Sequence, residues 1–165
     1  MILRLLTEPK LRAKIVYTLF IVYVLLALNL LFFIRSSLCG FCTYREYFRE
    51  NTNFVPFRTV IEFIGYIRER NAYYLEMSKD NLVGNILISM PAGVFMPALW
   101  KKQRNFRVFA LTIATAVIGV EVLQFITMRG ACDIDDFILN FFGAVIGYTL
   151  SRLKIIRKLM FISKE

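Results

Sequence analysis

Long apolar runs, each close to 20 residues, alternate with short polar segments along this chain. A helix rises about 1.5 Å per residue, so roughly 20 residues cross a bilayer core about 30 Å thick. Four runs have this length, at 15–34, 81–100, 108–127 and 134–153. The pattern predicts an all-α integral membrane protein with four transmembrane helices, forming a single domain over residues 1–165.

The composition supports a chain that is partly solvated by lipid. Hydrophobic residues make up 58% of its 165 residues, whereas soluble domains have about 45–50%. The net charge is +9, but the basic residues form short blocks between the apolar runs. Anionic headgroups explain such blocks better than nucleic acid does, so we expect membrane lipid, and no nucleic acid, as a partner.

The distribution of Lys and Arg predicts the orientation, because cytoplasmic loops carry an excess of basic residues. The N-terminal arm, the link between the second and third runs and the C-terminal tail hold thirteen of the 21 basic residues. Four spans with both termini in the cytoplasm place all thirteen on that side. The prediction is a multi-pass protein of the cell membrane.

The outer segment between the first two spans, residues 35–80, is long and nearly balanced in charge. Its stretch from Phe57 to Met77 has an aliphatic face at helical spacing, made by Val60, Ile61, Ile64 and Ile67. We expect an amphipathic helix on the outer membrane surface. The alternative is a folded cap that packs on the neighbouring loops.

Polar residues inside the runs are informative, because a charge near the bilayer centre costs at least about 2.5 kcal/mol. They recur at helical spacing and, in the predicted topology, all lie toward the outer side. These residues are Asn81, Asn85, Glu121, Gln124, Asp133, Asp136 and Asn140, with Arg129 in the link above them. The pattern predicts a ligand-binding polar pocket open to the outside. Gly143 and Gly147 continue one stripe and would let helices approach closely.

A structural role is the alternative for several of these positions. Hydrogen bonds that only hold the bundle together would explain the Asn and Gln side chains equally well. They explain the acids Glu121, Asp136 and Asp133 less readily. Asp135 points away from the stripe and is expected to be solvated or to cap a helix, and Asp133 is also a candidate cap. Pro91 and Gly93 predict a kink in the second span, either for packing or to expose backbone carbonyls to a cavity.

The chain has no histidine, which excludes Ser–His and Cys–His catalysis and His-ligated zinc. Glu121 and Asp136 remain the candidates for a general base and for ligands of a divalent cation, the one cofactor left open. Three cysteines are too few for a four-Cys zinc site. Cys39 and Cys42 form a C-x-x-C pair outside the first span, where a disulfide would leave Cys132 unpaired.

Three blocks of residues resemble the VanZ-like family. They are Asn53-Phe-Val-Pro-Phe57, then Asn81-Leu-Val-Gly-Asn85 with Pro91-Ala-Gly93, then Glu121-Val-Leu-Gln124 followed by Arg129, Asp133, Asp136, Asn140 and Gly143. The blocks keep the family's order and spacing and extend from about Asn53 to Tyr148. The long segment between Phe57 and Asn81 and the C-x-x-C pair depart from the family pattern.

The resemblance implies a bacterial plasma-membrane protein with a role in the cell envelope, and adds Asn53 to the candidate binding residues. The family's namesake is associated with low-level resistance of Gram-positive bacteria to teicoplanin, a glycopeptide with a lipid tail. The favoured function is therefore a non-enzymatic one: the pocket binds a lipid-linked cell-wall precursor or a lipoglycopeptide.

Two other functions stay open from the residues. A membrane enzyme would act on a lipid-linked phosphate or sugar, with Glu121 or Asp136 as the base and Arg129 holding a phosphate. A small ion-coupled transporter would require an oligomer, since four spans are few. It would also require polar residues through the inner half of the membrane, where this sequence has few.

Overall fold

The computed structural model describes residues 9–34, 43–69 and 72–160. This part of the chain is mostly helical and contains one short strand pairing. Its elements, in chain order, are α2 (Pro9–Asn29), the π-helical turn η1 (Leu30–Ile34), α3 (Tyr44–Glu50), β1 (Thr52–Asn53), α4 (Arg58–Glu69), α5 (Ala72–Leu99), the 3-10 turn η2 (Lys101–Arg104), α6 (Phe106–Ile126), β2 (Cys132–Asp133), α7 (Ile134–Ser151) and α8 (Lys154–Leu159). The prediction of an all-α protein is confirmed.

Within the described residues, three helical segments are long and apolar enough to cross a membrane: Lys10–Ile34, Ala72–Leu99 and Phe106–Ile126. They correspond to the first three predicted spans. The fourth, α7, has 18 residues and carries Asp135 and Asp136 in its first turn, which lowers its hydropathy. The count of four spans and the cytoplasmic termini stay predictions.

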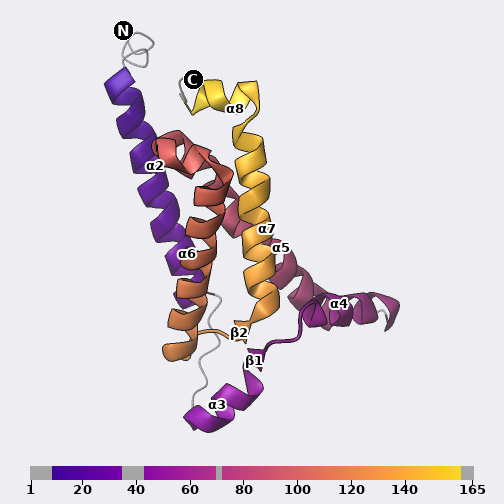
Figure 1. Cartoon of the computed structure of the whole chain (residues 1–165). Helices are drawn as coiled ribbons and strands as arrows, with labels where there is room; N and C mark the ends of the chain where they lie inside the picture. The colour runs from indigo at the N-terminus through magenta and orange to yellow at the C-terminus, as the bar shows by residue number, and fades with distance from the viewer. Residues whose placement is uncertain (1–8, 35–42, 70–71, 161–165) are drawn as a thin grey trace.

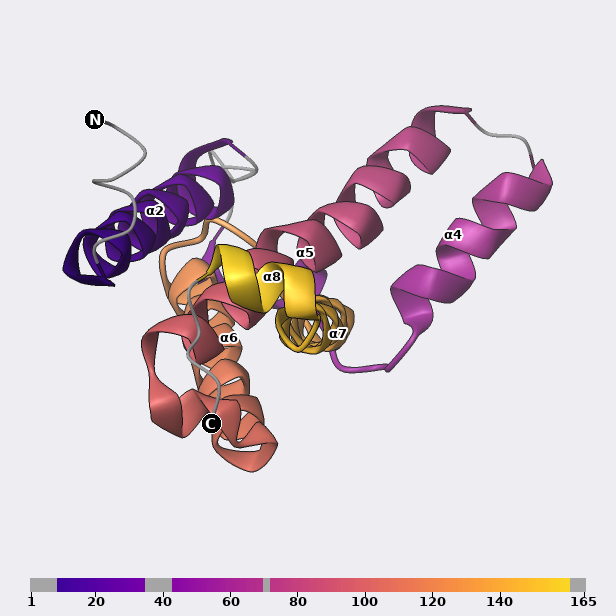
Figure 2. The ribbon, with the colours of Figure 1, turned by 90° about the horizontal axis from the view of Figure 1, so that it is seen from above.

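The elements divide between two ends of the molecule. The start of α2, the start of α6 and α8 lie at one end, and α3, α4, β1 and β2 lie at the other (Figure 1). We call them the basic end and the strand end, because the basic residues of η2 and α8 lie at the first. Helix α5 crosses obliquely, and its first turns extend away from the bundle beside α4 (Figure 2).

Helices α5 and α7 pack against each other through glycine. A Cβ atom built on Gly143 would lie 2.2 Å from the carbonyl oxygen of Ile86, and one built on Gly147 would lie 1.9 Å from that of Met90. Gly93 faces α7 in the same way, with its Cβ position 2.0 Å from the Ala144 oxygen. Only glycine permits this backbone contact. The small-residue stripe predicted on α7 therefore forms a helix–helix interface.

The predicted amphipathic helix is present but shorter than expected. It ends at Glu69, and α5 begins at Ala72 rather than Asn81. The prediction of a single helix from Phe57 to Met77 was therefore wrong. Its aliphatic face is open, with Ile61, Ile64 and Ile67 exposed by 66%, 59% and 51%. This open face suits a membrane surface, and that location stays a prediction.

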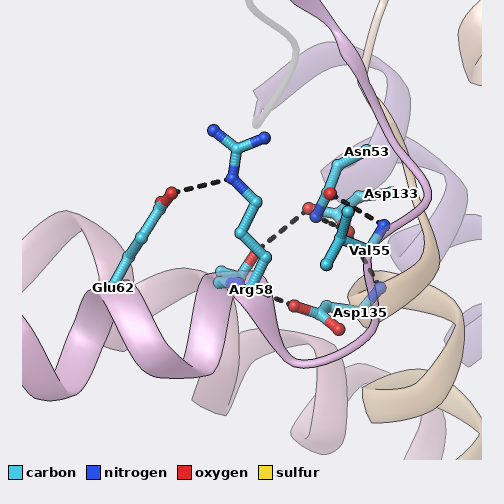
Figure 3. A network of polar contacts seen from close by, with 7 residues as sticks. Asn53, Val55, Arg58, Glu62, Asp133 and Asp135 are labelled. Atoms are coloured by element: carbon cyan, nitrogen blue, oxygen red, sulfur yellow. Dashed lines mark hydrogen bonds and ion pairs between the residues drawn. The ribbon is translucent and has the colours of Figure 1, made fainter.

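Asp135 anchors α4 from the neighbouring helix α7. It is only 1% exposed, and its two oxygens accept hydrogen bonds from the backbone N–H groups of Phe57 (2.5 Å) and Thr59 (2.7 Å). Figure 3 shows the carboxylate at the start of α4. The expectation of a solvated Asp135 was wrong, because the unpaired N–H groups at a helix start draw a carboxylate into a buried position. The expectation that Asp135 caps a helix was correct, and the helix that it caps is α4.

The backbone at Phe57 depends on this contact. Its φ angle is 64°, in the left-handed region that a bulky side chain rarely adopts, at a cost of about 1–3 kcal/mol. The carboxylate of Asp135 holds the Phe57 N–H in that conformation. Asp133 adds a bond from the Thr59 hydroxyl (3.0 Å) and caps α7 by accepting from the Asp135 N–H (2.8 Å).

Adding one methyl group to Gly143 or Gly147 is expected to disrupt the α5–α7 interface. Gly143→Ala and Gly147→Ala should each destabilise the protein by about 1–3 kcal/mol, because the new carbon overlaps a backbone oxygen that cannot move away. Gly119→Ala on α6 is the control, since a Cβ there meets nothing within 4 Å. Unfolding by SDS in mixed micelles measures the difference, and equal midpoints for all three variants would contradict the close approach.

Removing the Asp135 carboxylate is expected to release the start of α4. In Asp135→Ala, the amides of residues 57–60 should exchange faster with deuterium, and the protein should lose about 1–3 kcal/mol, because two buried N–H groups lose their acceptor. Glu62→Ala is the control: it removes an exposed ion pair to Arg58 (2.9 Å), worth about 0.2–0.5 kcal/mol. Unchanged exchange at the start of α4 in Asp135→Ala would refute this anchoring role.

Candidate functional site

A polar cavity of about 200 Å³ lies at the strand end, between η1, α3, α5, α6 and α7. Six of the predicted site residues line it: Asn81, Asn85, Glu121, Gln124, Arg129 and Asp136. We call this cavity the polar pocket. Residues from three predicted spans and one link thus face a single cavity, as the helical spacing of polar positions indicated.

The wall formed by α5 and α7 is a ladder of side-chain hydrogen bonds. Asn85, only 2% exposed, donates its amide to the carboxylate of Asp136 and also to the side-chain oxygen of Asn81 (3.3 Å). One turn further along, Ser89 donates to Asn140 (2.5 Å). The glycine contacts described above set the distance between α5 and α7. At this distance the amide of Asn85 meets the carboxylate of Asp136 directly.

The wall formed by α6 and its link holds the end of the first span. Gln124 donates to the backbone carbonyl of Leu31 (3.1 Å), and Arg129 donates to that of Phe32 (2.8 Å). The last carbonyls of a helix lack hydrogen-bond donors within the helix. The side chains of Gln124 and Arg129 are the donors for two of these carbonyls. The Arg129 guanidinium also lies 4.9 Å from the ring centroid of Phe33. Its position at the pocket edge is therefore fixed before any ligand binds.

Two lining residues, Tyr47 and Asn51, were missed by the sequence reasoning. Tyr47 is 2% exposed, and its hydroxyl donates to the carbonyl of Gly130. Burial raises the pKa of this hydroxyl, so it remains a donor at neutral pH. The sequence did contain a signal for the start of α3. It is a capping box, in which Thr43 and Glu46 exchange hydrogen bonds. The Thr43 contacts lower the pKa of Glu46, which keeps this cap charged.

Three predicted residues lie outside the polar pocket. Asn53 donates to Asp133 (3.0 Å) and accepts from the Val55 N–H (3.1 Å), so both Asn53 and Asp133 belong to the network that positions the outer segment (Figure 3). β1 pairs in parallel with β2 at the same place. Asn140 is buried below the pocket, where its amide donates to the Asp136 carbonyl (2.8 Å).

An apolar cavity of about 300 Å³ adjoins the polar pocket between α2, α5, α6 and α7. The two cavities share Leu31 and Glu121. Because Glu121 lines both cavities, it stands at the junction of the polar and apolar spaces. Its side chain is buried there, with 8% exposed. Apart from Ser89, Glu121 and Asn140, the lining of the apolar cavity consists of aliphatic and aromatic side chains, with the hydroxyl of Tyr23 donating to the Ile88 carbonyl (2.7 Å).

The acidic and cysteine residues limit the chemistry of the site. Among the residues described here, no three such side chains gather in a way that could hold a metal ion. Glu121 and Asp136 nevertheless line one cavity, and Mg²⁺ often needs only one or two carboxylates beside a substrate phosphate. Cys132 is not in a disulfide. Burial, with smaller contributions from Glu121 and Asp133, raises its thiol pKa, which disfavours a nucleophilic role. Cys39 and Cys42 lie outside the described residues.

Comparison with protein families agrees with the motifs. The family model VanZ/LLP1 matches residues 20–157, which include every lining residue of the polar pocket and all but the start of the first candidate span. No curated protein and no solved structure matches the chain significantly. The match covers most of the sequence, and this chain therefore belongs to the VanZ/LLP1 family.

Proposed function

We propose that this protein binds an amphipathic cell-envelope molecule, with the polar part of that molecule in the polar pocket and its chain in the apolar cavity. The family suggests a membrane protein of the cell envelope that is linked to glycopeptide resistance. The molecule is a lipid-linked cell-wall precursor or the anchor of a lipoglycopeptide. Its retention lowers the access of lipid-tailed glycopeptides such as teicoplanin to their target.

The observation that carries this proposal is the junction of the two cavities at Leu31 and Glu121. A ligand that is half lipid and half polar needs two adjoining spaces of opposite character. The polar side offers amide and guanidinium donors from Asn81, Gln124 and Arg129. The apolar side is bounded by α2, α5 and α6, the candidate membrane spans of the described residues, so a hydrocarbon chain would enter it from the bilayer.

Catalysis on a lipid-linked phosphate is the second candidate function. Glu121, Asp136 and Arg129 line the same cavity, and such a set can activate water or bind a divalent ion while the guanidinium holds a phosphate. Transport is less well supported. The polar residues are concentrated at the strand end, and the space below them is lined mainly by hydrocarbon.

Neutralising the pocket carboxylates tests whether their charge is used. We expect the wild-type chain, expressed in a sensitive Gram-positive host, to raise the teicoplanin inhibitory concentration several-fold and to change that of vancomycin less, because vancomycin has no lipid tail. Asp136→Asn and Glu121→Gln should abolish this protection, because each substitution removes a charge that faces the ligand and leaves the side-chain shape intact.

Glu62→Gln is the matched control, since it neutralises an exposed carboxylate on α4 and should protect like wild type. Membrane levels of all variants are equalised by quantitative immunoblot. Full protection by Asp136→Asn and Glu121→Gln would show that the acids serve structure alone. No protection by the wild type would refute the resistance role.

Filling the apolar cavity tests the chain-binding half of the proposal. Val120 lines the cavity on α6, whereas Val122 on the same helix is 46% exposed and faces away from it. Val120→Trp should lose teicoplanin protection, because the indole occupies space meant for the hydrocarbon chain, and Val122→Trp should retain it. Equal protection by the two variants, at equal membrane levels, would show that the cavity is not used.

A further inference from the structure

A third cavity, of about 380 Å³, lies at the basic end, far from the polar pocket. Four cationic side chains line it: Lys101 and Arg104 of η2, Arg152 at the end of α7, and Arg157 of α8. We call this cavity the basic pocket. Its floor contains Pro97 and Ser151, both buried. Short loops and helix ends from four elements thus converge on one space.

Two of the cations are held in place by the protein. The Nε of Arg104 donates to the Pro97 carbonyl (3.3 Å), and the Arg104 carbonyl accepts from the Tyr148 hydroxyl (2.5 Å). Arg152 donates to the same carbonyl (3.4 Å), and its guanidinium lies 5.8 Å from the Tyr148 ring centroid. Side chains that are already ordered lose less entropy when they bind a ligand.

The charge of the basic pocket is one-sided. None of its lining residues is acidic. Helices η2 and α8 contain no acidic residue, whereas α3 and α4, which lie at the strand end (Figure 1), both contain glutamates. Like charges gathered around one cavity repel each other, and an anion bound between them relieves this repulsion. A phosphate group offers oxygens that guanidinium groups bind in pairs.

Helix α8 places the pocket at the membrane surface. It lies across the direction of α7 (Figure 1) and exposes Ile155 by 73% and Leu159 by 61%, beside Lys154 and Lys158. Exposed aliphatic residues next to lysines are typical of a helix that rests at the headgroup level. The basic pocket beneath it would therefore lie where lipid phosphates are found.

From these features we propose that the basic pocket binds a phosphate group, with an anionic membrane lipid as its source. The lipid headgroup bridges η2, α7 and α8 and holds these elements together. Basic pockets between membrane helices commonly hold such headgroups. This site is independent of the polar pocket and would be occupied whether or not that pocket holds a ligand.

Native mass spectrometry of the full chain in mild detergent tests the proposal. Delipidated protein is mixed with phosphatidylglycerol or phosphatidylcholine at equal concentration. We expect phosphatidylglycerol to be retained preferentially, and Lys101→Gln/Arg157→Gln to weaken its retention by at least about tenfold, because two cationic contacts are lost. Within the described residues, the side chains of Lys101 and Arg157 make no hydrogen bond or ion pair, so the melting temperature without lipid should stay unchanged.

The matched control is Lys154→Gln/Lys158→Gln, which removes the same charge from α8 outside the pocket and should retain the lipid like wild type. Inorganic phosphate serves as a competitor: failure to displace the lipid identifies a headgroup site, and displacement at low millimolar concentration identifies a site for free phosphate. Equal loss of lipid in both double variants, or no loss in either, would overturn the proposal.

Discussion

The glycine contact between α5 and α7 determines most of the remaining structure. With Gly93, Gly143 and Gly147 against opposing carbonyls, the two backbones lie closer than any larger side chain would allow. Where they touch, the two helices run in the same chain direction, so Asn85 meets Asp136 and Ser89 meets Asn140. In lipid there is little hydrophobic drive between helices, and such close packing supplemented by hydrogen bonds takes its place.

Hydrogen bonds explain how three acids are tolerated at the end of an apolar bundle. Each carboxylate of α7 has a different task within one turn: Asp133 caps its own helix, Asp135 caps α4, and Asp136 meets Asn85 at the polar pocket. All three carboxylates therefore accept hydrogen bonds from the protein. Asp136 and the nearby Glu121 face a cavity, and this placement separates acids that build the outer segment from acids that are available to a ligand.

The sequence predicted what depends on periodicity and missed what depends on backbone geometry. Length and hydropathy located the first three spans, and helical spacing brought six polar residues to one pocket. Asp135 was misjudged because its partners, the N–H groups of Phe57 and Thr59, lie far away in sequence and carry no side-chain signal. Tyr47 and Asn51 were missed because the hydrophobic pattern of a seven-residue helix is too short to recognise, although its capping box was readable.

The position of Arg129 bears on which ligand chemistry the polar pocket favours. One guanidinium nitrogen is committed to the Phe32 carbonyl and the plane lies near Phe33, so part of its donor capacity serves the end of the first span. Holding a dianionic phosphate would normally use several donors at once. A pocket with one partly committed guanidinium, several amides and two carboxylates is better suited to the hydroxyl and amide groups of a sugar or peptide. This balance favours binding of a lipid-linked glycopeptide-like headgroup over phosphoryl chemistry at that end of the molecule.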